Sequence, residues 1–379
     1  MKYQIRIISL WIVIIQQVIN IGFAAEPGDS LIWTGIKAWY NYDTGESVAI
    51  LDSARQLFPE NPTVHLVYAA ARYQHSQAVD PVAENYRILS NDLAEVIPIY
   101  EQLIEQYPQK AVYRLYYGSA IGLKARIHLG RKEWIRTLWH AYKGFSIIRR
   151  VADENSDFID AQLPIGLVEY YAGLSGGLVK FGAGLFGLEP SIETGRAAIL
   201  RAAADGDFSW MEANGIISYL YLYIENKPHL AFQYAERLVN AFPGNWYYRQ
   251  LLTHCQLTTG DLESGFESLQ WLSDQYTALP AMHKTTFFGY LHYEWAFYHF
   301  LQGDYSAALE SANLAIEHYD AELDAVLANA LLLKGQLLDI DGNRAEAVQL
   351  YQQVIDLDNF CYAIKMADTN LNSPYQVVK

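Results

Sequence analysis

Segments of one pattern recur along this chain of 379 residues, and this repetition restricts the possible folds more than any other feature. In the clearest copy, LQGDYSAALESANLAIEHYD at 301–320, a Gly-Asp turn is followed by small residues at helical spacing. Related segments carry a small residue at the equivalent position, and these positions are Ala231, Gly265, Ala308 and Ala347. Their separations of 34, 43 and 39 residues indicate one supersecondary unit repeated along the chain.

The second half of the same unit is found nearer the N-terminus. ESVAILDSARQLFPENP at 46–62 and LAEVIPIYEQLIEQYPQ at 93–109 share its helical pattern and its terminal proline. Two helices pack closely only if the side chains at their crossing are short, and each hairpin leaves an apolar face that the next hairpin covers. Strand-like alternation of comparable length is not found in the sequence. The sequence therefore predicts an all-α fold.

This pattern resembles the tetratricopeptide repeat, a helix-turn-helix of 34 residues with small residues at the helix crossing and a proline at its end. The resemblance covers residues 212–361 well and 40–110 loosely, whereas 111–210 shows general helical periodicity. It departs from the family in its first-helix signature, where Trp295 and Ala296 stand in the best copy, and in two spacings longer than 34. The resemblance implies an α-solenoid that forms a right-handed superhelix. It also implies a non-enzymatic scaffold that binds a protein or peptide partner on a concave surface.

First-helix residues, about one per turn, line the groove of tetratricopeptide repeats. The resemblance carries these positions onto Leu220 and onto a set of rings: Tyr223, Tyr247, His254, Tyr290, Tyr293, Phe297 and Phe300. An extended ligand laid along an open groove would stack on these rings. A stripe of this kind equally suits a buried core, and the C-terminal segment Thr369–Lys379 is a candidate cover for it.

The first 24 residues have the order of a secretory signal: a charged start, an apolar run at 7–15, and small residues at Gly22 and Ala24. Polar residues from 16 onward interrupt the run before it is long enough to span a bilayer, which favours cleavage over an uncleaved anchor. We therefore predict a signal peptide at 1–24, degenerate repeats at 25–160, a glycine-rich apolar helical insert at 161–210, and further repeats at 211–379. A periplasmic or secreted location is expected, with membrane association left open.

A formal net charge of −15 at pH 7 disfavours nucleic acid as a partner. One stretch has the opposite character, because residues 124–150 contain eight basic side chains and one glutamate. The predicted basic patch consists of Lys124, Arg126, Arg131, Lys132 and Arg136. A solvated helix face would explain it; the alternative is a dock for a lipid head group, an acidic polysaccharide or a partner's carboxylate. Together with the many Tyr and Trp residues, it suggests a second hypothesis, an envelope module that binds polysaccharide or lipid.

Motifs that would indicate catalysis or metal binding are weak in this sequence. GLSGG at 173–177 fits the Gly-x-Ser-x-Gly nucleophile elbow, but the strand that this motif requires is not predicted before it. His292 and His299 lie on one helix face, yet the sequence has no HExxH or CxxC pattern. Cys255 and Cys361 are expected to be buried thiols rather than a disulfide. The sequence predicts no catalytic residue, no metal site and no cofactor.

Overall fold

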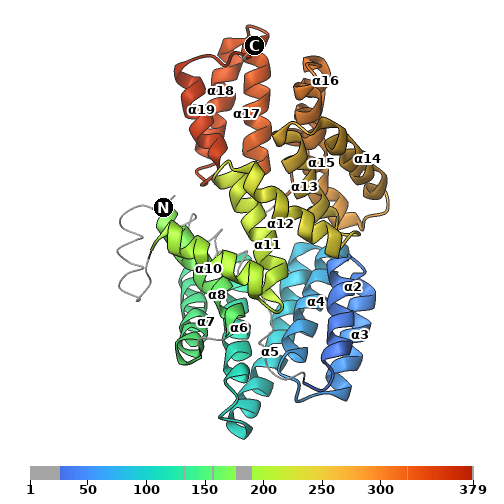
Figure 1. The fold of residues 1–379 in the computed structure, drawn as a ribbon, viewed down its shortest axis with the longest axis vertical. Helices are drawn as coiled ribbons and strands as arrows, with labels where there is room; N and C mark the ends of the chain where they lie inside the picture. Colours follow the sequence, from blue (N-terminus) through green and yellow to red (C-terminus); the bar gives the residue numbers. More distant parts are fainter. Residues whose placement is uncertain (1–25, 131–132, 156–157, 176–189, 322, 378–379) are drawn as a thin grey trace. The chain divides into compact units, whose positions relative to one another are not determined.

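The computed structural model describes residues 26–377, apart from 131–132, 156–157, 176–189 and 322. Within these residues every regular element is a helix, and consecutive helices pack side by side, as in an α-solenoid (Figure 1). The predicted all-α fold is therefore confirmed.

The chain divides into two compact units, one up to Ile217 and one from Ser218. The first unit contains α2 (Asp29–Tyr40), α3 (Thr44–Leu57), α4 (Val64–Val79), α5 (Val82–Gln106), α6 (Ala111–Gly130), α7 (Trp134–Glu154), the short η3 (Ile159–Ala161), α8 (Gln162–Leu174), α10 (Ile192–Asp205) and most of α11 (Ser209–Tyr219). The second contains the π-helical turn η4 (Leu220–Ile224), α12 (Pro228–Ala241), α13 (Trp246–Thr259), α14 (Leu262–Tyr276), α15 (Ala281–Leu301), α16 (Tyr305–Glu317), α17 (Ala325–Ile340), α18 (Arg344–Asp356) and α19 (Tyr362–Asn372). The division falls inside α11.

The turn inside three hairpins of the second unit has one geometry. A glycine in the left-handed region follows the first helix of each hairpin: Gly260 with φ 85°, Gly303 with φ 78° and Gly342 with φ 82°. The amide of the next residue donates to the carbonyl oxygen five residues earlier, at 2.9, 2.9 and 2.8 Å, and these donors are Asp261, Asp304 and Asn343. This bond closes a helix whose last residue is left-handed, a conformation that glycine adopts without steric cost. The Gly-Asp signal in the repeats therefore ends one helix and begins the next.

The first hairpin of the first unit closes with the same turn but lacks the glycine. The amide of Asp43 donates to the carbonyl oxygen of Ala38 at 2.9 Å, and Tyr42 occupies the left-handed position with φ 68°. A residue with a Cβ atom in this conformation is strained by roughly 1–2 kcal/mol. The loose resemblance over 40–110 thus begins with a turn equivalent to those of the second unit.

We expect Tyr42→Gly to be more stable than Tyr42→Ala by about 1 kcal/mol, because both variants lose the ring and only glycine adopts positive φ freely. Thermal unfolding of the two variants measures this difference directly. An alanine variant as stable as the glycine variant would contradict the left-handed turn.

The turn between hairpins recurs as well. The helices α3, α5 and α12 are followed by an aromatic residue with φ near −130° and ψ between 60° and 71°, and then by proline. The amide of this aromatic residue donates to the carbonyl oxygen four residues earlier at 2.8–2.9 Å; the three residues are Phe58, Tyr107 and Phe242. Proline lacks an amide hydrogen and disfavours helical backbone in the residue before it. The terminal prolines of the sequence pattern thus mark where these helices end.

Small residues lie where helices meet. Ala231, Gly265, Ala308 and Ala347 are all buried, as the repeat pattern predicts. Glycines bring α8 and α10 still closer: a Cβ atom on Gly195 would lie 2.3 Å from the backbone nitrogen of Tyr170, and one on Gly166 would lie 2.7 Å from the Gly195 carbonyl oxygen. The glycine-rich stretch therefore supports close helix packing at Gly166, while its part at 176–189 lies outside the described residues.

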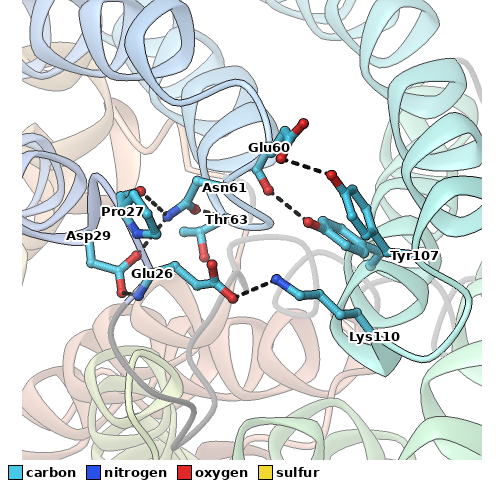
Figure 2. Close-up of polar contacts among 9 residues, drawn as sticks. Glu26, Pro27, Asp29, Glu60, Asn61, Thr63, Tyr107 and Lys110 are labelled. Atoms are coloured by element: carbon cyan, nitrogen blue, oxygen red, sulfur yellow. Dashed lines mark hydrogen bonds and ion pairs between the residues drawn. The ribbon is translucent and has the colours of Figure 1, made fainter.

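Loops of successive hairpins in the first unit are tied together by polar contacts (Figure 2). The side-chain amide of Asn61, after α3, donates to the carbonyl oxygen of Pro27 at 3.1 Å and to the carboxylate of Asp29 at 2.7 Å. Lys110, before α6, forms an ion pair with Glu26 at 2.9 Å. The start of α2 and the residues just before it are thereby tied to the loop between α3 and α4 and to the loop between α5 and α6.

Candidate functional site

The predicted groove residues come from neighbouring first helices of the second unit. Tyr223 lies in η4, His254 in α13, and Tyr293 and Phe297 in α15. Their rings are in contact, because the centroid of His254 lies 5.2 Å from that of Tyr223 and 5.5 Å from those of Tyr293 and Phe297. A second contact joins Tyr247 of α13 to Tyr290 of α15, with centroids 6.4 Å apart. The structure therefore brings these residues together in space.

Most of this aromatic cluster is buried, which corrects the expectation of an open groove lined by all seven side chains. Tyr223, His254, Tyr290 and Tyr293 are 2%, 6%, 7% and 3% exposed, and Leu220 is fully buried. The physical reason is that rings from adjacent first helices fill the space between them. The remaining three are partly exposed, and these are the side chains that a ligand could reach: Tyr247, Phe297 and Phe300.

A buried polar network lies beneath the cluster. Glu294 of α15 is fully buried; its carboxylate lies 3.1 Å from Nδ1 of His254 and accepts a hydrogen bond from the side-chain amide of Gln250 at 2.7 Å. The same amide of Gln250 donates to the hydroxyl of Tyr223 at 2.9 Å. Burial, together with the charge of Glu294, raises the pKa values of Tyr223 and Tyr293 well above their usual range, so both phenols stay neutral. Through these contacts the network holds the rings of Tyr223 and His254 in place.

Sequence reasoning did not select Glu294 or Gln250. The available signal was a lone acidic residue inside the aromatic first helix HYEWAFYH, where neighbouring positions are apolar. Buried charges are stable only when they are paired and hydrogen-bonded, so such a residue implies partners on adjacent helices.

The C-terminal segment that was predicted as a cover reaches Phe300. The ring of Tyr375 lies 6.3 Å from that of Phe300, and its amide donates to the carboxylate of Asp339 at 2.8 Å. The guanidinium of Arg344 binds the same carboxylate and donates to the carbonyl oxygens at the end of α19. One edge of the partly exposed rings is thus bounded by the chain's own C-terminal segment.

The predicted basic patch is only partly a surface feature. Arg126 is 3% exposed and its Nε donates to the hydroxyl of Tyr73 on α4 at 3.1 Å, so its assignment to a solvent-facing patch is corrected. Lys124 is half-buried, and Arg136 is exposed with an ion pair to Glu133 at 3.4 Å. Arg131 and Lys132 lie outside the described residues.

The side chains considered as nucleophiles are either hydrogen-bonded within a helix or buried. Ser175 follows the helix α8 rather than a strand, and its hydroxyl donates to the carbonyl oxygen of Tyr171 at 2.9 Å. Cys255 and Cys361 are buried free thiols, and burial raises the pKa of Cys361 to about 12. Among the described residues, no three His, Cys, Asp or Glu side chains come together in a way that could hold a metal ion. No helix in the described part of the chain is both long enough and apolar enough to cross a bilayer.

Neither a model of a known protein family nor a curated protein sequence matches this chain. The architecture alone does not define an activity, because one fold supports many functions. Function is therefore inferred from the residues and contacts described above.

Proposed function

We propose that this protein is a non-enzymatic, exported scaffold of the tetratricopeptide type, which binds a protein or peptide partner along the first helices of its second unit. The observation that carries the proposal is the set of partly exposed rings, Tyr247, Phe297 and Phe300, above the buried aromatic cluster. Aromatic side chains are enriched among the residues that dominate binding energy at protein interfaces. Rings already held by packed neighbours lose little conformational freedom on binding.

The repeat type is supported by three recurring features: the left-handed glycine turn, the aromatic-proline helix end and the buried small residue. The proposed absence of catalysis is supported by Ser175, whose hydroxyl is bonded to its own helix, and by Glu294 and His254, which are buried together. Export is supported by the signal-like order of residues 1–24. It predicts a mature N-terminus at Ala25, which N-terminal sequencing of protein from the cell envelope would determine.

A photoreactive amino acid at Phe297 should form a covalent adduct with a discrete protein in intact cells. The same amino acid at Glu310, which is exposed on the second helix α16, serves as the matched control and should form no such adduct. Identical adducts at both positions, or none at Phe297 in correctly folded protein, would contradict a partner on the first helices. An adduct with lipid or glycan at Phe297 would favour the alternative function, an envelope module that binds polysaccharide or lipid.

Two ring deletions on α15 should separate binding from folding. Phe297→Ala is expected to weaken partner recovery by about tenfold or more while the melting temperature changes little, because this ring is partly exposed. Tyr293→Ala is expected to cost about 3 kcal/mol or more of stability, because its ring is 3% exposed. Equal losses of stability would show that Phe297 belongs to the core and would remove it from the proposed site.

A further inference from the structure

Helix α7 in the first unit has two contrasting faces. Its inner face is apolar and consists of Ala141, Gly144, Phe145, Ile148 and Val151, all buried. Its outer face presents Arg136, Trp139, Tyr142 and Arg150, all exposed, with the half-exposed Lys143 between them. The spacing is three residues from Arg136 to Trp139, three or four from Trp139 to Tyr142 and Lys143, and seven from Lys143 to Arg150, so these positions form one stripe along the helix.

The two aromatic residues of this stripe are unusual for the chain. Trp139 is 57% exposed and Tyr142 is 43% exposed, whereas the other aromatic side chains that the structure describes are buried or half-buried. The other large hydrophobic side chains exposed to this degree among the described residues are aliphatic. The two exposed rings lie three residues apart, so they face the same side of the helix.

Cationic groups surround the two rings. The ammonium of Lys143 lies 5.2 Å from the ring centre of Trp139, and the side chain of Arg136 is 69% exposed. Acidic groups lie at both ends of the stripe: Glu133 pairs with Arg136 at 3.4 Å and with His128 at 2.6 Å, and beyond Arg150 the exposed Glu154 pairs with Arg114 at 2.6 Å, next to the exposed Asp153. From Arg136 to Arg150 the stripe extends about 21 Å along the helix. The protein as a whole carries a net charge of −15, so this positive stripe is a local exception.

We infer that the outer face of α7 binds the surface of an anionic phospholipid bilayer. Trp and Tyr rings favour the boundary between lipid tails and water, while Arg and Lys side chains can reach anionic head groups above them. The apolar face of α7 stays packed inside the protein, so the contact consists of the two rings and the cations of the outer face at the level of the head groups, and it needs no spanning segment. This inference is independent of the proposed partner site in the second unit.

Vesicle binding of the full chain tests the inference. Binding to vesicles of phosphatidylglycerol and phosphatidylcholine should be compared with binding to phosphatidylcholine alone. Arg136→Glu combined with Lys143→Glu should weaken binding to the anionic vesicles at least tenfold, and Trp139→Ala should weaken it without a change of charge. The matched control is Lys37→Glu combined with Lys365→Glu, two exposed lysines on α2 and α19, which should bind as the wild type does. Thermal unfolding verifies that each variant is folded.

A local probe separates this face from any contribution of residues 1–24. Ser146→Cys adds a thiol to the outer face of α7, while Cys255 and Cys361 are buried and react slowly. An environment-sensitive fluorophore at this position should shift to the blue with anionic vesicles and remain unchanged with phosphatidylcholine. An unshifted probe, or equal loss of binding in the reversed variant and its control, would overturn the inference. Binding to an acidic polysaccharide but not to vesicles would assign the face to sugar instead and overturn it equally.

Discussion

Replacing Asp160 with alanine is expected to destabilise the protein by about 3 kcal/mol or more, because several buried donors lose their acceptor together. Asp160 lies in η3 and is 6% exposed. Its carboxylate accepts hydrogen bonds from the amides of Asp207, Phe208 and Ser209 at 2.9, 3.4 and 3.2 Å, and from the Ser209 hydroxyl. The side chain thus fixes the turn between α10 and α11 to the start of α8. An ordinary helix cap contributes only about 1 kcal/mol.

The pH dependence of this contribution has a definite sign. Burial raises the pKa of Asp160 to about 7, while the hydrogen bonds from Ser209 and Phe208 oppose the shift. The folded state therefore holds the proton more tightly than the unfolded chain, whose pKa at this group is near its usual value of 3.8. Stability from this group is present at acid pH and is lost as the pH rises toward 7 and above. Asp160→Asn, which cannot ionise, should lack this part of the pH dependence.

Urea unfolding of the wild type, Asp160→Ala and Asp160→Asn at pH 5 and pH 8 measures both effects. Asp153→Ala, at an exposed position of α7, is the control and should change stability by less than about 0.5 kcal/mol. An alanine variant at Asp160 as stable as this control would show that the turn does not depend on the carboxylate.

The local rules of the fold could be predicted from the sequence. Gly303 and Asp304 form the predicted turn because a left-handed position favours glycine and an aspartate side chain caps the following helix. Ala308 is buried as predicted, because a helix crossing admits only a short side chain. The turn at Tyr42 could not be predicted in this way, because tyrosine is not a typical turn residue. Its backbone nevertheless has the same left-handed conformation as the turn glycines.

The sequence could predict which residues of the candidate site lie close together, but not which of them are exposed. The helical period places Tyr293 and Phe297 on one face of α15, and they do pack together, with ring centres 6.2 Å apart. The period does not show what covers that face, so it could not separate the buried Tyr293 from the partly exposed Phe297. Arg126 was misplaced for the same reason, since a count of basic residues ignores that α6 turns this side chain toward Tyr73.

The glycines of the α6–α7 hairpin provide a matched pair with opposite expected effects. A Cβ atom on Gly144 of α7 would lie 2.6 Å from the backbone nitrogen of Gly122 and 2.7 Å from the carbonyl oxygen of Gly118. Backbone atoms cannot turn aside as a flexible side chain can, so Gly144→Ala must separate the two helices. We expect it to cost about 2 kcal/mol or more. A Cβ atom on Gly122 of α6 would meet no atom within 4 Å.

Gly122→Ala is therefore expected to stabilise the protein by about 0.5–1 kcal/mol, because alanine loses less backbone entropy than glycine in a helix interior. Both variants replace a helical glycine of one hairpin by the same residue, so helix propensity favours both equally and only the contact with the opposite backbone differs. Gly118→Ala should fall between them, since its Cβ atom would lie 3.0 Å from a methyl carbon of the Ile147 side chain, which can shift. Chemical unfolding of the three variants should give the stability order Gly122→Ala, Gly118→Ala, Gly144→Ala. A Gly144→Ala protein at least as stable as the wild type would mean that α6 and α7 do not approach each other through their backbones.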